Sequence, residues 1–137
     1  MQLDSSAFVA DPEVVQLLTE RATPLECEED RVLFRQGEMP RGLYIVEQGE
    51  ATLSMDSWAG DSLLSFQTTA GSLLGLPGLV GNCPYSMGAV ARAGARLSYI
   101  SREEFTTLMQ ANPMLSLKIL QILAAEVHSA RRAVCPA

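Results

Sequence analysis

The residue types that most often mark metal centres and disulfide frameworks are scarce in this sequence. Its 137 residues include one histidine and three cysteines, Cys27, Cys83 and Cys135. Because the cysteines are odd in number and widely spaced, they predict neither a disulfide framework nor a zinc or iron–sulfur site. Such cysteines suit a reducing compartment, so we expect a cytoplasmic protein without a bound metal.

The sequence also has few charged residues and no long apolar runs. Charged residues make up 19% of the chain, and the net charge of −6 argues against a surface that neutralises nucleic-acid phosphates. No apolar run approaches the ~18 residues of a membrane span. The N-terminal segment MQLDSSAFVADPE lacks the basic start and apolar run of a secretory signal. With 47% hydrophobic residues, the sequence predicts a single domain over residues 1–137 with a core of its own.

Glycine is absent from both ends of the chain, since all ten glycines lie between Gly37 and Gly94. Glycine marks turns and weakens helices, so helical ends should flank a turn-rich middle. Apolar residues at helical spacing predict a short amphipathic helix over 12–22. From about 30 to 100, short apolar runs alternate with turns, which is typical of a small barrel or sandwich. The expected strands cover 32–34, 43–46, 51–55, 62–66, 89–91 and 96–100.

Two helices are expected after the last strand. Ser101-Arg102-Glu103-Glu104 matches a capping box, which predicts a helix over about 102–111. Asn112 as a cap and Pro113 in a first turn then predict a second, longer helix over about 113–133. A helix, a set of strands and two closing helices together indicate an α+β fold.

The long helix is apolar on two faces. One face carries Leu115, Ile119 and Ile122, and another follows the 3-4 spacing of a coiled-coil seam. A helix of this kind must be covered on both sides, and the chain offers no second helix of that length. We therefore expect a homodimer across a two-fold axis, the alternative being a helix buried within one monomer. The predicted dimerisation residues are Leu120, Leu123, Val127 and Ala130.

No motif of an enzyme is recognisable. A nucleophile–base pair, a Walker loop, HExxH and an acid/base carboxylate pair are all missing, so we expect no enzymatic activity. The single histidine, His128, is expected in solvent near the end of the long helix rather than as a metal or haem ligand. Cys83 has no neighbouring base in the sequence and is expected to be an ordinary thiol.

Three segments carry a family resemblance: LFRQGEMPRGLYIVEQGEATL at 33–53, GSLLGLPGLVGNCPYSMGAV at 71–90, and ISREEFTTLM with the following NP and long helix at 100–133. In this order and spacing they resemble the cyclic nucleotide-binding domain of Crp/Fnr-type regulators. The resemblance implies an eight-stranded, jelly-roll-like β-roll and a short helix in the second segment, the phosphate-binding cassette. It also implies that the long helix pairs across a dimer and covers the ligand pocket.

The cassette departs from the family pattern at two positions. Binding members of the family have a glutamate for the ribose hydroxyl directly after the glycine that corresponds to Gly75, and here that residue is Leu76. The arginine that pairs with the cyclic phosphate corresponds to Tyr85. A hydrogen bond to a charged group contributes about 1.5–3 kcal/mol, so losing two weakens binding by roughly two to four orders of magnitude. We therefore expect weak binding of cAMP or cGMP, or another small phosphorylated ligand in their place.

Other groups could still hold a ligand. The start of the expected cassette helix offers backbone amides to a phosphate, Ser86 offers a hydroxyl, and Arg131 or Arg92 could reach an anion. Leu76, Tyr85 and Met87 could instead line a pocket for a less polar molecule. The candidate ligand-binding residues are Gly75, Leu76, Pro77, Tyr85, Ser86, Met87 and Arg131.

The expected function is that of a non-enzymatic sensor. Crp/Fnr-type regulators continue past the long helix into a DNA-binding domain, whereas this sequence ends at Ala137, so we expect no direct contact with DNA. The alternative is a dimerisation or protein-interaction scaffold with a vestigial pocket that serves a separate effector chain.

Overall fold

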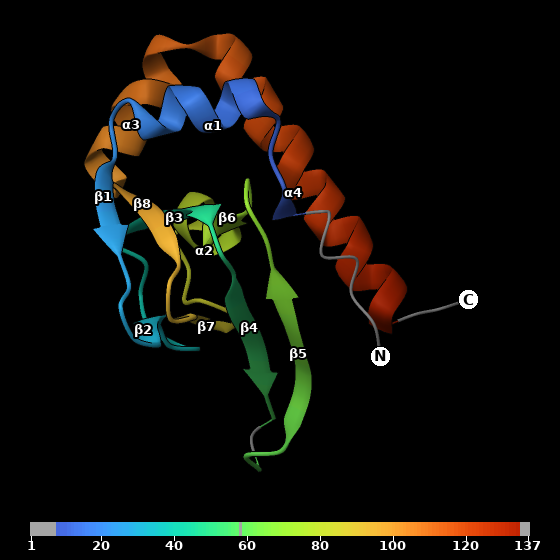
Figure 1. The fold of residues 1–137 in the computed structure, drawn as a ribbon. Helices are drawn as coiled ribbons and strands as arrows, with labels where there is room; N and C mark the ends of the chain where they lie inside the picture. Colours follow the sequence, from blue (N-terminus) through green and yellow to red (C-terminus); the bar gives the residue numbers. More distant parts are fainter. Residues whose placement is uncertain (1–7, 58, 135–137) are drawn as a thin grey trace.

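The structure is a computed structural model that describes residues 8–57 and 59–134, with the side chains of residues 8–57 and 59–128. The helices at the two ends of the chain agree with the prediction, although the first is three residues shorter (Figure 1). They are α1 (Pro12–Thr19), α3 (Arg102–Ala111) and α4 (Pro113–Val134). Between them lie the strands β1 (Thr23–Glu26), β2 (Arg31–Phe34), β3 (Gly42–Gln48), β4 (Ala51–Asp56), β5 (Ser62–Thr68), β6 (Leu73–Leu74), β7 (Gly88–Ala91) and β8 (Arg96–Ser101), with the short helix α2 (Leu76–Gly81) after β6.

The strands form a β-roll of two antiparallel sheets, as the resemblance implied. One sheet has the order β1-β8-β3-β6 and the other β2-β7-β4-β5. The prediction missed β1 and β6. β1 is polar and mostly exposed, and β6 has two residues, which is too short for any periodicity to be seen. The roll therefore begins at Thr23, before the predicted boundary near residue 30.

Strand alternation divides the buried residues into two cores. In β3, Leu43 and Ile45 face the helices while Tyr44 and Val46 face the interior of the roll. The helix-side core consists of Ala10, Val14, Leu18, Leu43, Ile45, Leu73, Leu76, Leu79, Ile100, Phe105, Leu108, Leu115 and Ile119. The roll core consists of Phe8, Cys27, Phe34, Val46, Ala51, Leu53, Leu74, Tyr85, Ala89, Ala91, Ala95 and Leu97.

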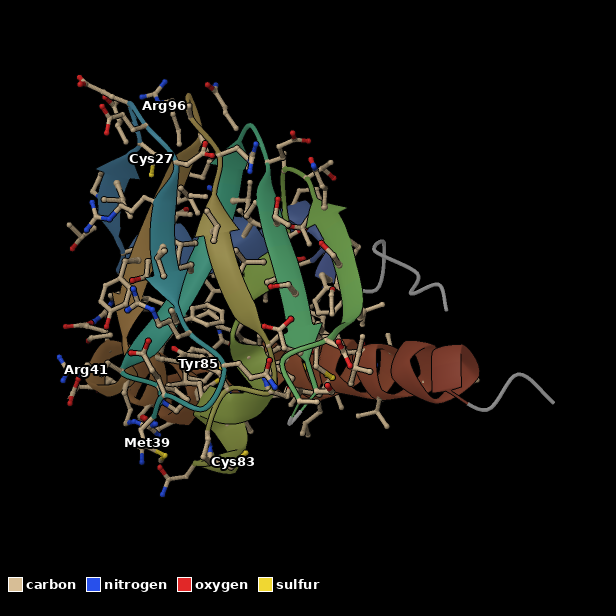
Figure 2. All side chains as sticks on the ribbon, turned by 90° about the horizontal axis from the view of Figure 1, so that it is seen from below. Cys27, Met39, Arg41, Cys83, Tyr85 and Arg96 are labelled. Atoms are coloured by element: carbon tan, nitrogen blue, oxygen red, sulfur yellow. The ribbon has the colours of Figure 1, made fainter. Side chains whose placement is uncertain are left out.

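Two side-chain caps start the closing helices, as predicted. The Ser101 hydroxyl accepts a hydrogen bond from the amide of Glu104 at 3.2 Å, and the Asn112 side chain accepts one from the amide of Leu115 at 3.1 Å. The first part of α4 packs against α3, and its second part extends past the β5 edge of the roll (Figures 1 and 2). Among its described side chains, α4 contributes Leu115 and Ile119 to the helix-side core, with Ile122 and Leu123 partly buried against it.

Candidate ligand-binding site

The cassette forms a tight turn into α2. Gly75, the residue before this helix, has a φ of +93°, a left-handed conformation that favours glycine. A Cβ at this position would lie 2.7 Å from Cε1 of Tyr85, so a larger residue would collide with the ring. Pro77 lies exposed in the first turn of the helix. The predicted helix start is therefore present, and it is packed closely against Tyr85.

Tyr85 fills space inside the roll. Its ring is stacked on Phe34 with centroids 3.8 Å apart, and its hydroxyl donates a hydrogen bond to the Gly42 carbonyl at 3.2 Å. Burial raises the pKa of Tyr85 to about 12, so the phenol is neutral at physiological pH. Its carbonyl accepts from the amide of Gly37 at 2.8 Å, and its own amide donates to the carbonyl of Glu38 at 2.9 Å. Tyr85 thus ties the cassette to the turn between β2 and β3.

Leu76 points away from Tyr85. Its side chain is fully buried in the helix-side core, next to Leu73 and Leu79, whereas Tyr85 belongs to the roll core. The prediction that Leu76 and Tyr85 line one pocket is therefore wrong. The two side chains belong to different cores, and a carboxylate at position 76 would enter an apolar one.

The remaining predicted ligand residues do not meet at one place. Ser86 is exposed, and Met87 is half-buried against the roll core. Arg92 forms an ion pair with Asp30 at 3.3 Å. The side chain of Arg131 lies outside the part of the chain that the structure describes, as does that of Ala130 in the predicted seam.

A tyrosine-lined cavity lies at the end of the roll near the β2–β3 turn, where Figure 2 places Tyr85, Met39 and Arg41. It has a volume of about 400 Å³, and Tyr44 and Tyr99 contribute to its wall with ring centroids 5.0 Å apart. Burial raises the pKa of both Tyr44 and Tyr99. The cavity therefore presents neutral phenols as hydrogen-bonding groups. Of the predicted ligand residues whose side chains the structure describes, Tyr85 alone lines it.

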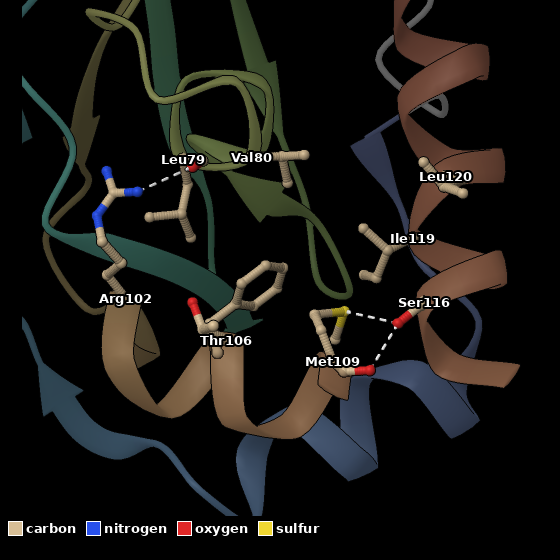
Figure 3. A pocket seen from close by; sticks show the side chains of 9 residues that line it. Leu79, Val80, Arg102, Thr106, Met109, Ser116, Ile119 and Leu120 are labelled. Carbon is tan, nitrogen blue, oxygen red and sulfur yellow. Dashed lines mark hydrogen bonds between the residues drawn. The ribbon is translucent and has the colours of Figure 1, made fainter. Parts of the chain in front are cut away.

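A second cavity, of about 330 Å³, lies where α2, α3 and α4 meet (Figure 3). Among the described side chains that form its wall, most are apolar and Arg102 is the one charged residue. The Arg102 guanidinium donates to the Leu79 carbonyl at 3.2 Å and to the Pro40 carbonyl at 2.9 Å. In the sequence, Arg102 was recognisable only as part of the capping box. Its contact with α2 depends on residues far away in the chain, which no local pattern reveals.

The described residues contain neither a cluster of metal ligands nor a membrane-spanning helix. Within them, no group of three or more histidine, cysteine, aspartate or glutamate side chains is placed to hold a metal ion. His128 and Cys83 are both exposed. None of the described helices has the length and apolar character that a membrane crossing requires.

An eight-stranded β-roll with a short cassette helix and a long closing helix is the fold of a cyclic nucleotide-binding domain. The family model of the cyclic nucleotide-binding domain matches residues 24–112, and the chain belongs to this family. A search of curated proteins finds no match.

Solved structures support the same fold. The chain is 22% identical to the catabolite activator protein of Thermus thermophilus with a TM-score of 0.78, covering 96% of this chain and 62% of that one. A protein from a cyclic-GMP-dependent signalling pathway in bacterial phytopathogenesis is 22% identical with a TM-score of 0.75. The match covers 87% of this chain and 94% of that one. A cyclic nucleotide-binding-like protein from Brucella abortus is 29% identical with a TM-score of 0.57. The match covers 73% of this chain and 85% of that one. The chain thus spans less than two thirds of the Thermus protein.

Proposed function

We propose that this chain is a non-enzymatic, homodimeric regulatory module in which cAMP and cGMP bind weakly or are replaced by another ligand. The observation that carries this proposal is the position of Tyr85. Where the resemblance places an arginine for the cyclic phosphate, a neutral phenol stacks on Phe34 and bonds to the backbone of Gly42. Leu76, where a glutamate would hold the ribose, is buried away from the roll interior.

Exposed apolar residues on α4 support the dimer. Leu120 is 58% exposed and Val127 is 52% exposed, on a helix whose other face is buried through Leu115 and Ile119. Leu123 is half-buried and packs partly against the helix-side core. A second copy of α4 would cover the exposed side chains in a symmetric interface. A ligand that favours one arrangement of the two helices would then change the geometry of the dimer.

Calorimetric titration with cAMP and cGMP tests the ligand part of the proposal. Because two charged contacts are missing, we expect dissociation constants of about 1 mM or weaker. Binding at about 10 µM or tighter would contradict the argument from Tyr85 and Leu76. A titration with 5′-AMP is the control for general attraction of nucleotides. If all three nucleotides give no heat and the dimer persists, the scaffold alternative is supported instead.

Replacing Val127 tests the dimer. We expect Val127→Arg to halve the mass measured by light scattering, because it places a charge among the exposed apolar residues of α4. Leu63→Arg is the matched control, since Leu63 is 50% exposed but lies on β5. A wild-type monomer, or a dimer unaffected by Val127→Arg, would refute the interface on α4.

A further inference from the structure

The cavity between α2, α3 and α4 has the features of a binding site that the cyclic nucleotide-binding family match does not account for. We propose that it binds a small amphipathic carboxylic acid, with Arg102 at one edge of the cavity for the carboxylate and apolar side chains of the three helices lining the hydrocarbon body (Figure 3). The site requires residues of one copy only, so it does not depend on the proposed dimer.

The walls of the cavity are suited to an apolar molecule of limited size. Each of the three helices contributes apolar side chains, and together they enclose about 330 Å³. A cavity of roughly 150 Å³ holds benzene, so this one accommodates about ten to twelve non-hydrogen atoms. The apolar lining consists of Leu79 and Val80 from α2, Phe105 and Met109 from α3, and Ile119 and Leu120 from α4.

Arg102 is the charged group of the cavity, and it is held in place without an acidic partner. Two carbonyl groups, of Leu79 and Pro40, accept hydrogen bonds from its guanidinium. A guanidinium has five N–H donors, so donors remain for a ligand. No carboxylate among the described residues forms an ion pair with Arg102, and Glu104 on the same helix pairs with Arg21 instead. The Arg102 guanidinium is therefore a fixed cation whose charge no described carboxylate balances.

Thr106 and Ser116 line the cavity with hydroxyl groups, which differ in whether they already donate a hydrogen bond. The Ser116 hydroxyl already donates to the Met109 carbonyl at 2.8 Å, whereas Thr106 lies beside Arg102 (Figure 3). One cation, one neighbouring hydroxyl and an apolar wall match a carboxylate with a hydrocarbon body. A nucleotide would need further polar partners for its sugar and base. The ligand class is therefore a monocarboxylic acid rather than a nucleotide.

Octanoate, with ten non-hydrogen atoms, is the probe for this site, used with the full chain in calorimetric titrations. We expect Arg102→Gln to weaken octanoate binding by about tenfold to a hundredfold, because a charged hydrogen-bond partner is lost. Val80→Trp, which fills the cavity from an exposed position and keeps Arg102, is expected to weaken binding to a similar degree. Arg96→Gln is the matched control, an exposed arginine on β8 at the opposite end of the roll (Figure 2), and it should leave the affinity unchanged.

The neutral analogue 1-octanol separates the charge from the hydrocarbon body. We expect octanol to bind the wild type at least about tenfold more weakly than octanoate does. Its affinity for Arg102→Gln should equal its affinity for the wild type. No heat with octanoate at up to about 10 mM would overturn the proposal, as would equal affinities for octanoate and octanol. Wild-type affinity in Val80→Trp would place the acid elsewhere and also overturn it. None of these results bears on the titrations with cAMP and cGMP, so the two proposals fail separately.

Discussion

The interior of the β-roll and the junction of α2, α3 and α4 are packed in different ways. In the roll, aromatic rings and alanines fill the space, and Phe34 and Tyr85 lie in stacking contact at 3.8 Å. At the junction, aliphatic side chains from three helices leave a cavity of about 330 Å³ beside Arg102. Tyr85, where the family resemblance implies an arginine, is held by Phe34 and Gly42, and the tyrosine-lined cavity of about 400 Å³ lies beside it. The cavity at the junction of α2, α3 and α4 differs from it in having a mostly apolar wall.

The largest effect is expected from a charge in the helix-side core. Leu76→Glu should lower the free energy of unfolding by about 4 kcal/mol, because it removes a fully buried leucine and places a carboxylate among apolar side chains. Denaturant unfolding measures this change. Val80→Glu, on the exposed side of the same helix, should change the stability by less than about 0.5 kcal/mol. A well-tolerated Leu76→Glu would show that position 76 faces the roll interior after all.

The second-largest effect is expected for Tyr85, whose ring stacks on Phe34 inside the roll. Tyr85→Ala should lower the free energy of unfolding by about 3 kcal/mol, because it removes the ring that stacks on Phe34 and leaves a cavity. Tyr85→Phe, which keeps the ring and loses the hydrogen bond to Gly42, should cost about 1 kcal/mol. Thermal and denaturant unfolding of the two variants measure the difference. Equal costs for both would mean that the hydroxyl, and not the ring, holds the cassette against the roll.

The smallest of the three effects depends on pH and concerns the far end of the buried face of α4. Glu126 is buried, neither of its carboxylate oxygens has a hydrogen-bond partner among the described residues, and burial raises its pKa to about 8. Between about pH 4.5 and 8 the folded state retains a proton that the unfolded state has released, so the free energy of unfolding falls as the pH rises through this range.

Glu126→Leu should remove this pH dependence and stabilise the protein by about 2 kcal/mol at pH 8.5, with a smaller gain at pH 5. Urea unfolding at the two pH values measures both numbers. Glu103→Leu on α3 is the control, since Glu103 is exposed. An equal gain at both pH values would show that packing, rather than the buried charge, accounts for the change.

Much of the fold could be predicted because it depends on local patterns. The capping box at Ser101, the Asn112 cap and the apolar spacing of α4 each act within a few residues, and each appears in the structure. β1 escaped prediction because its burial and pairing with β8 depend on the rest of the roll rather than on its own sequence.

The candidate site was less predictable, because side-chain direction there does not follow any period. Leu76 and Tyr85 lie in a six-residue helix and a loop, where neither helical nor strand alternation decides which way a residue points. The resemblance identified both as departures from the family pattern, but not that they enter different cores. The position of Arg102 against the Leu79 carbonyl depends on how α3 packs on α2, which is a property of the folded chain.

Leu120 belongs both to the proposed acid-binding cavity and to the proposed dimer surface of α4. The same side chain lines the cavity beside Arg102 and lies exposed on α4, where a second copy would cover it. A molecule in the cavity and a neighbouring subunit would therefore touch one common leucine. If the acid and the second copy favour different positions of Leu120, their affinities are coupled, and the strength of acid binding then varies with the protein concentration at which it is measured.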